Sequence, residues 1–271
     1  FSISFCAVST AARWKSRSMS DILIRLHGVT GKVSGNVFPA FGERNIVRHE
    51  QIPKEGTNYL FVDFAWNRKW YCLWMRVWQV KGKKRVIVYR EWPDYQTYGE
   101  WVMPSEKPDG DRGPAQQTMG WGIQQYRDMI TEMENGEPIY MRYGDPRSGN
   151  AASLGPDQAT SILEQLSQPD DDGTGGMHVE PVRVVGLGKS LINEGVNLIN
   201  KWLEWDRDRD AIDGNEPVLY VSDQCRNLIE CLRMWTGRGG DTGASKDPID
   251  LLRYAALMDI SQIDDQMDMT G

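Results

Sequence analysis

Asp63 is the first residue of this chain whose type and setting could do chemistry. It is the one charged residue in the stretch Tyr59–Trp66, whose aromatic and β-branched residues are typical of a buried strand. An ionised carboxylate in apolar surroundings needs a compensating cation or several hydrogen-bond donors, because its burial is otherwise costly. A divalent metal is one such partner, so the function depends on whether other carboxylates can reach Asp63.

Three further aspartates could join Asp63. Asp145 follows the strand-like run Pro138–Tyr143, and Asp247 and Asp250 lie at the start of the last predicted helix. If the strands before Asp63 and Asp145 are neighbours in one sheet, these carboxylates converge, and the first helical turn brings Asp250 over the same edge. Hard oxygen ligands in this number suit Mg²⁺ or Mn²⁺. Two such ions about 4 Å apart would stabilise the attacking water and the leaving oxygen in phosphodiester hydrolysis.

Each carboxylate also has a purely structural explanation. Asp63 could bond to backbone donors at a strand end, and Asp145 before Pro146 is ordinary turn chemistry. Asp247 before a proline is the expected N-cap of a helix, and Asp250 as the third helical residue would favour the helix dipole. Because Asp247 and Asp250 are three residues apart, they share a helix face, and capping does not exclude metal binding.

The elements that must position these residues are predicted from the hydrophobic pattern. Three strand-like runs, Asn58–Trp66, Trp70–Val80 and Arg85–Trp92, are joined by short polar turns and predict an antiparallel meander. Apolar residues at helical spacing predict a helix within Ala115–Glu134. The next strand, Pro138–Tyr143, then lies parallel in the same sheet if the crossover is right-handed.

The remaining elements alternate between helix and strand. Helices are predicted at Asp157–Leu166, Ser190–Trp205, Asn227–Trp235 and Pro248–Met258, and strands at Val179–Val185 and Val218–Ser222. The order βββαβαβα predicts an α/β fold, an RNase H-like mixed central sheet flanked by helices and extended by a short strand and C-terminal helices. Residues 1–50 are predicted to be an N-terminal linker with a hairpin around Asn36–Phe41, residues 51–260 the domain, and residues 261–271 an acidic tail.

Three acidic motifs carry a family resemblance. They are Val-Asp-Phe-Ala at 62–65, Tyr-Gly-Asp-Pro at 143–146 and Lys-Asp-Pro-Ile-Asp-Leu-Leu-Arg-Tyr at 246–254. The sequence resembles the nuclease domain of the large terminase subunit, the DNA-packaging motor of tailed bacteriophages. The third motif is the most specific, because the family's last acid commonly sits directly before such an apolar-Arg-Tyr run.

The resemblance assigns roles to the four acids. By it Asp63, Asp145 and Asp250 are the catalytic metal ligands, and Asp247 occupies a position where some members carry an auxiliary acid or His. It implies an endonuclease that uses two Mg²⁺ or Mn²⁺ ions to hydrolyse concatemeric double-stranded viral DNA in the host cytoplasm during genome packaging. The implied partners are DNA, the terminase ATPase domain, the small terminase subunit and the portal.

An ATPase motif is not predicted in this chain. Gly186 to Ser190 ends like a phosphate-binding loop, but Arg183 stands where the G-x-x-x-x-G-K-[ST] pattern needs its first glycine. Lys189 is therefore expected to belong to the surface or the start of a helix.

Clustered cations are the candidates for DNA contact. The turn between the second and third predicted strands carries Lys81, Lys83, Lys84 and Arg85, which could neutralise phosphates without reading bases. Lys246 would add to this stripe if it faces the same cleft. Solvated turn lysines are the alternative explanation, and the sequence leaves both open.

Composition limits the classes of function. A net charge of −7 argues against coating nucleic acid by bulk electrostatics, although a local basic stripe is compatible with it. No apolar run approaches membrane-spanning length. Two other functions remain open for the same fold: an inactive DNA-clamping or docking module, and another RNase H-like nuclease such as a junction resolvase.

Overall fold

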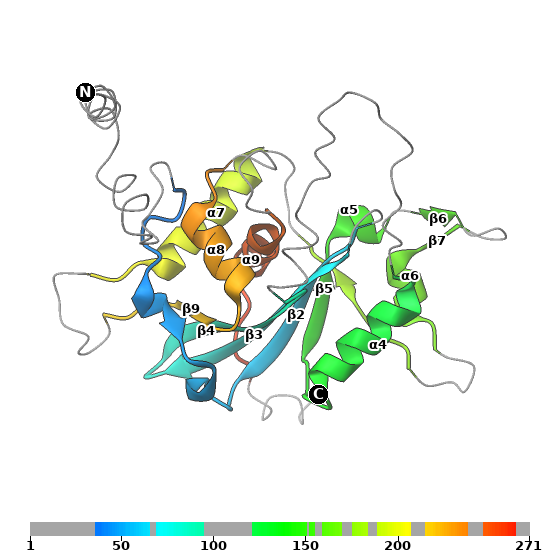
Figure 1. Cartoon of the computed structure of the whole chain (residues 1–271), viewed down its shortest axis with the longest axis horizontal. Coiled ribbons are helices and arrows are strands. Elements are labelled where there is room, and N and C mark those ends of the chain that lie inside the picture. Colours follow the sequence, from blue (N-terminus) through cyan, green and yellow to red (C-terminus); the bar gives the residue numbers. More distant parts are fainter. Residues whose placement is uncertain are drawn as a thin grey trace, which may run out of the picture.

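The chain forms a mixed β-sheet with helices on both faces (Figure 1). The computed structural model describes residues 36–65, 69–94, 121–150, 152–154, 159–169, 175–183, 189–206, 215–237 and 246–263. Most of the predicted linker, the segment 95–120 and the tail from residue 264 onward lie outside the described residues.

The central sheet has seven strands. They are β1 (Ile46–Val47), β2 (Thr57–Asp63), β3 (Tyr71–Val80), β4 (Lys83–Trp92), β5 (Met141–Gly144), β8 (Glu180–Pro181) and β9 (Leu219–Ser222), in the spatial order β1-β9-β4-β3-β2-β5-β8. β2, β3 and β4 are antiparallel neighbours, whereas β5 is parallel to β2 and β9 is parallel to β4. The meander is β2–β3–β4, and the next strand of the sheet, β5, lies beside β2. This is the RNase H-like arrangement that the sequence predicts, so the predicted fold class is confirmed.

Helices follow the strands in the predicted order. They are α4 (Ile123–Glu134), α5 (Pro146–Gly149), α6 (Ile162–Ser167), α7 (Lys189–Leu203), α8 (Arg226–Met234) and α9 (Asp247–Leu257), with two short 3-10 helices, η1 (Glu43–Asn45) and η2 (His49–Gln51). A separate antiparallel hairpin is formed by β6 (Ala152–Leu154) and β7 (Ala159–Ser161). None of the helices in the described ranges has both the length and the apolarity needed to cross a bilayer.

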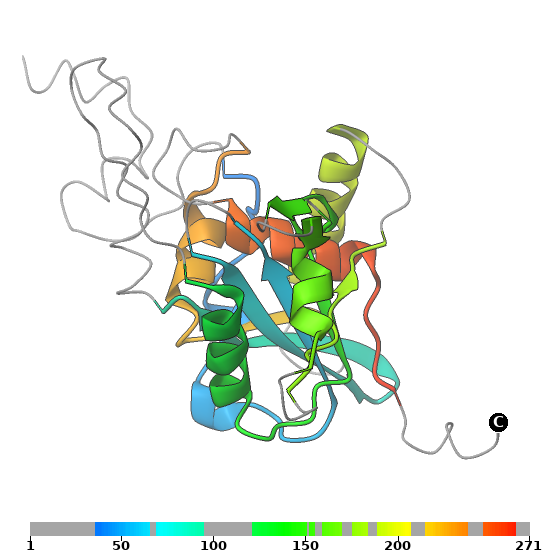
Figure 2. The same cartoon turned by 90° about the vertical axis from the view of Figure 1, so that its right-hand side faces the viewer.

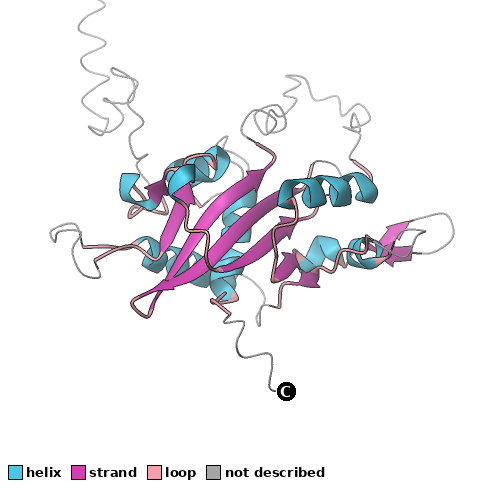
Figure 3. Ribbon diagram, turned by 90° about the horizontal axis from the view of Figure 1, so that it is seen from below, coloured by secondary structure: helices cyan, strands magenta, loops and turns pink. Residues whose placement is uncertain are grey.

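Alternating side chains of the central strands build two hydrophobic cores. In β2, Tyr59 and Phe61 pack with residues of α7, α8 and α9, whereas Leu60 and Val62 pack with residues of α4 and α6. Successive residues of a strand point to opposite faces, which explains this division. We call the two sides the α9 face and the α4 face; Figure 3 shows the strands between these helices.

The structure differs from the sequence predictions near the N-terminus and before α6. Residues 36–41 form turns instead of a hairpin, and Phe38 is buried with its ring stacked on Trp235. Together with β1, which pairs with β9, these residues belong to the folded unit although the predicted domain began at residue 51. Helix α6 starts at Ile162, five residues later than predicted, because residues 159–161 form a strand.

A β-bulge changes which residues of β4 face α8. Val86 and Val88 lie on the α9 face, and the pairing with β3 then shifts register between Trp74 and Met75. A bulge adds one residue to one strand and so reverses the alternation beyond it. Glu91 consequently lies on the α9 face, beneath the start of α8.

The buried Glu91 carboxylate accepts three hydrogen bonds. The Tyr71 hydroxyl donates to Oε2 at 2.7 Å, and the backbone N–H groups of Asn227 and Leu228 donate at 2.7 and 3.0 Å. The last two are first-turn donors of α8, which have no partner within the helix. Burial raises the pKa of Glu91 to about 7, and the three donors oppose this rise.

Glu91 should make the protein less stable as the pH rises from 4.5 to about 7. The raised pKa means that the folded state binds this proton more tightly than the unfolded state, so stability is greatest below the unfolded value and is lost up to the folded value. The full difference corresponds to about 3 kcal/mol. Urea unfolding across this range should show a flatter pH dependence for Glu91→Gln than for the wild type.

Tyr71→Phe provides the complementary measurement. It removes a donor that favours the ionised carboxylate, so the loss of stability should extend to higher pH than in the wild type. An identical pH dependence in the wild type and in Glu91→Gln would contradict the assignment to Glu91.

Candidate functional site

Asp63 and Asp145 lie next to each other at the carboxyl ends of two parallel strands. In the register of β2 and β5, Val62 is the partner of Gly144, so each aspartate is one residue beyond this pair. The backbone N–H of Asp145 donates to the carbonyl oxygen of Val62 at 2.9 Å, which continues the ladder to this point. The predicted neighbourhood of the two strands is therefore confirmed.

Both aspartates are directed to the same face of the sheet. Asp63 continues the alternation of Tyr59 and Phe61, and Asp145 continues that of Met141 and Tyr143, all of which pack on the α9 face. Figure 2 shows α9 (orange-red) lying across this side of the strands.

Helix α9 joins the site through Tyr254. Its hydroxyl donates to Asp145 Oδ1 at 2.8 Å. Burial raises the pKa of Tyr254 far above its usual value, and the negative charges of Asp145, Asp250 and Asp63 raise it further. The three predicted acids therefore lie within electrostatic reach of one hydroxyl group, which remains a hydrogen-bond donor.

Asp250 lies one helical turn before Tyr254 and is paired with two cations. Arg253 donates to Asp250 Oδ1, and the Lys246 Nζ lies 3.5 Å from Oδ2. Burial raises the pKa of Asp250, while Arg253 and Lys246 act in the opposite direction. Its side chain keeps 19% of its surface exposed, so it remains accessible from solvent.

Asp247 is more deeply buried than Asp250. It is the first residue of α9, and Lys246 occupies the N-cap, so the helix begins one residue earlier than predicted. Asp247 is 1% exposed. Burial raises the pKa of the Cys231 thiol on α8, and the negative charges of Glu91, Glu230 and Asp247 raise it further. Its predicted role as an auxiliary ligand stays a prediction.

The donor set has the chemistry that a hard divalent cation needs. Asp63, Asp145 and Asp250 carry carboxylate oxygens, the type of ligand that such a cation prefers. In the conformation described, Asp145 is held by Tyr254 and by the Ser148 backbone, and within the described ranges no three His, Cys, Asp or Glu side chains form a group that could hold a metal ion. The shared coordination of a metal by these acids stays a prediction.

The predicted DNA contacts are divided between opposite ends of the sheet. Lys246 lies at the acidic edge, within 3.5 Å of Asp250. Lys81 and Lys83 lie at the turn after β3, whose ten residues separate them from the Asp63 end by about 30 Å.

Two further cations of that turn make internal contacts. The Lys84 Nζ lies 2.7 Å from Asp259 Oδ1, and the Arg85 Nη2 lies 3.3 Å from Glu216 Oε2. Arg85 is also only 5% exposed. The structure therefore does not bring the hairpin cations together with the acids, and their contact with DNA stays a prediction.

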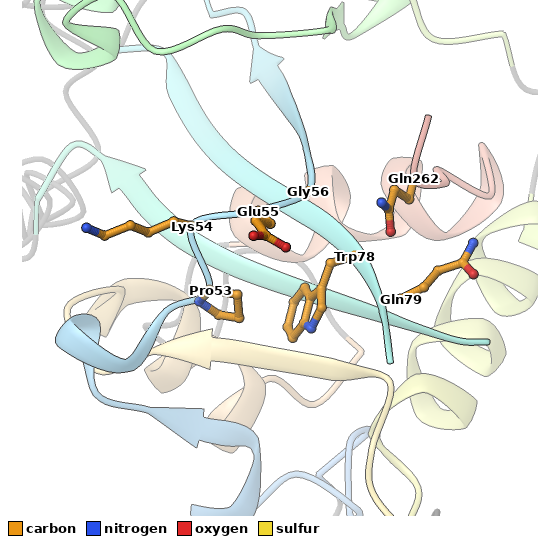
Figure 4. A pocket seen from close by; sticks show the side chains of 7 residues that line it. All are labelled: Pro53, Lys54, Glu55, Gly56, Trp78, Gln79 and Gln262. Carbon is orange, nitrogen blue, oxygen red and sulfur yellow. The ribbon is translucent and has the colours of Figure 1, made fainter. Parts of the chain in front are cut away.

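A pocket opens at the end of the sheet opposite the acids (Figure 4). It is lined by Pro53, Lys54, Glu55, Gly56, Trp78, Gln79 and Gln262. The Trp78 indole lies among these side chains, and Glu55 is the only carboxylate of the lining. The pocket lies away from Asp63, Asp145 and Asp250 and contains a single carboxylate, so it is not the place where several acids could share a metal ion.

Arg253 and Tyr254 are residues of the site to which the sequence assigned no role of their own. Each holds one of the predicted acids, Arg253 within α9 and Tyr254 between α9 and β5. Arg253 and Tyr254 are three and four residues after Asp250, a spacing that puts them on the same helix face as Asp250 and could have indicated their role. The partner of Tyr254 lies more than a hundred residues away in sequence, and only the fold reveals it.

Gly144 is needed where the two acidic strands meet the α4 face. A Cβ at this position would overlap Phe64 Cε2 and lie 2.7 Å from its Cζ. The Phe64 ring is itself held by Trp70, with ring centroids 4.8 Å apart. The absence of a side chain at Gly144 therefore lets β5 approach the segment that follows Asp63.

The fold and the site define an RNase H-like α/β domain with acidic residues at the carboxyl edge of its sheet. Among solved structures, the chain is similar to the large terminase of a thermophilic bacteriophage, with 12% identity over 89% of this chain and 52% of that chain and a TM-score of 0.49. It is also similar to the nuclease domain of the large terminase of bacteriophage P22, with 14% identity over 86% of this chain and 96% of that chain and a TM-score of 0.48.

Both of these solved structures contain a large terminase or its nuclease domain, the class of protein that the sequence resemblance names. The chain spans about half the length of the first terminase. No protein-family model and no curated protein matches it. Because the identities are below 25% and the TM-scores below 0.5, the function is inferred from the residues of the site.

Gly144→Ala should destabilise the protein by about 1–3 kcal/mol, the usual cost of forcing extra atoms into a packed core. The added methyl group must displace the Phe64 ring, which Trp70 holds in place. Urea unfolding measures the loss. Gly122→Ala is a suitable control, because the nearest atom to a Cβ there is a Gln125 side-chain oxygen at 3.9 Å. Equal stability of the two variants would show that Phe64 yields freely.

Proposed function

We propose that this chain is the nuclease module of a phage large terminase subunit, a metal-dependent endonuclease that hydrolyses double-stranded viral DNA. One observation carries the proposal. Asp63 and Asp145 end neighbouring parallel strands on the face covered by α9, whose Tyr254 bonds Asp145 and whose Asp250 lies one turn away. The motifs around these three acids are those of the family resemblance.

The chemistry assigns separate tasks to the residues. Asp63, Asp145 and Asp250 would hold Mg²⁺ or Mn²⁺, with Asp247 as an auxiliary acid. One or two such ions would supply Lewis-acid stabilisation of the scissile phosphodiester and of the attacking water. Lys246, which lies beside Asp250 with its side chain 55% exposed, would contact a phosphate of the bound strand.

The biological context belongs to the same proposal. A nuclease module of this kind would act in the host cytoplasm together with a terminase ATPase domain, a small terminase subunit and the portal. Concatemeric DNA is its proposed substrate, cut at the start and finish of genome packaging.

Asp63→Asn should abolish the activity. The wild-type protein is expected to nick plasmid DNA in Mn²⁺, and EDTA should stop this nicking. The nicking rate of the variant should be lower by at least about 100-fold, since the variant loses a charged metal ligand. Asp259→Asn is the matched control, because Asp259 is exposed and pairs with Lys84 on the opposite side of the fold. Full nicking by Asp63→Asn would exclude the proposed site, whereas the absence of metal-dependent nicking by the wild type would favour the non-catalytic module.

The substrate distinguishes the proposed enzyme from other RNase H-like nucleases. Linear duplex, a four-way junction and an RNA:DNA hybrid can be offered at equal concentration. Preferential cleavage of the duplex supports the proposal, whereas preference for the junction or the hybrid would contradict it.

Lys246→Gln should weaken DNA binding more than Lys83→Gln. Each phosphate contact contributes about one to the slope of log K against log salt, so loss of the Lys246 contact should lower that slope by about one. Fluorescence anisotropy with a short duplex, in an Asp63→Asn background that prevents cleavage, measures it. A lowered slope for Lys83→Gln with no change for Lys246→Gln would place the DNA on the β3–β4 hairpin instead.

A further inference from the structure

The Asp145 carboxylate is held from two sides. Its Oδ1 accepts a hydrogen bond from the Tyr254 hydroxyl at 2.8 Å, and its Oδ2 accepts one from the Ser148 backbone N–H at 3.1 Å. Asp145 is only 6% exposed, so few other orientations are available to it. The Ser148 bond is an ordinary helix cap. The Tyr254 bond connects Asp145 to a different element.

Helix α9 therefore acts on two acids from adjacent positions. Arg253 bonds Asp250 within the helix, and Tyr254 bonds Asp145 across to β5. The close approach of α7 supports this arrangement, since a Cβ at Gly195 would lie 3.1 Å from the Cβ and Cγ of Arg253. Helix α7 thus packs closely against α9 at the turn that carries both contacts.

The Tyr254 hydroxyl can hold the Asp145 carboxylate while Asp145 remains free to bind a metal ion. A phenol hydroxyl that donates to one carboxylate oxygen leaves that oxygen a further lone pair. It also restricts rotation of the carboxylate, in the way that outer partners orient the ligands of metal sites. Hydroxyl removal in Tyr254→Phe leaves the ring, which packs against the α9-face core, in place.

We propose that Tyr254 is a positioning residue, whose hydroxyl holds the Asp145 carboxylate at the sheet edge, from where it can join Asp63 and Asp250 in binding a divalent cation. This inference rests on the proposed function. It adds that cation affinity depends on a hydrogen bond between α9 and β5 as well as on the acids.

Tyr254→Phe should bind Mn²⁺ about ten-fold more weakly than the wild type, the lower end of the effect of removing such partners. Titration of the whole chain with Mn²⁺, followed by the electron paramagnetic resonance signal of the free ion, measures affinity without any reaction. In nicking assays, the rate of the variant should return toward that of the wild type as Mn²⁺ approaches saturation.

Tyr59→Phe is the matched control. Its hydroxyl donates to the backbone carbonyl of Ser261 at 2.8 Å, and it lies near the opposite end of β2 from Asp63. This variant loses a hydrogen bond of the same length and should bind Mn²⁺ like the wild type. Melting temperatures measured in EDTA show whether either variant changes the fold.

The outcomes separate this inference from the proposed function. Wild-type Mn²⁺ binding that Asp63→Asn removes but Tyr254→Phe leaves unchanged would overturn the role of Tyr254 alone. Tighter binding by Tyr254→Phe would also overturn it, because the hydroxyl would then compete with the cation. No Mn²⁺ binding by the wild type would instead contradict the proposed metal site.

Discussion

The burial of several carboxylates on α9 and beneath it is the constraint on which the rest of the structure depends. Negative groups that leave water must be given cations or donors, because their desolvation is otherwise too costly. Asp250 receives Arg253 and Lys246, and Asp145 receives the Tyr254 hydroxyl and a backbone N–H. The first turn of α9 adds a favourable helix dipole for its own acids. The helix is thus both the cover of the sheet edge and the source of most of the charge compensation.

The sheet creates this edge by two simple geometric rules. Parallel strands end at the same edge, so the β2–β5 register is sufficient to bring Asp63 beside Asp145. Alternation along each strand then directs both acids to the α9 face. In β4 a bulge reverses the alternation and brings Glu91 to the same face, although there it meets the start of α8.

The predictions from sequence were most accurate where a local pattern was strong. The three central strands and α9 were located to within a few residues, since each carries an uninterrupted run of apolar residues. β1 has only two residues, and it pairs with β9, which is far away in sequence. No local sequence pattern therefore predicts this strand. The predicted start of α6 was wrong although the sequence carries a signal for the true start. This signal is the capping box that Ser161 and Glu164 form. The hairpin cations are candidates for DNA contact because they cluster in the sequence, and the length of β3 carries them to the end of the sheet opposite Asp63.

Two kinds of buried carboxylate in this fold support different functions. Glu91 is 6% exposed and accepts three hydrogen bonds from neutral donors. These bonds join β3, β4 and α8, so they give Glu91 a structural role. The side chain of Asp250 is 19% exposed and is balanced by Lys246, whose own side chain is 55% exposed. An exposed lysine can exchange its carboxylate for solvent or a phosphate at little cost, because surface ion pairs are weak. Asp250 is therefore balanced in part by a partner that a divalent cation could replace, whereas Glu91 accepts hydrogen bonds from neutral donors. This difference, more than the number of acids, fits the proposed metal-binding role of Asp250 better than a purely structural one.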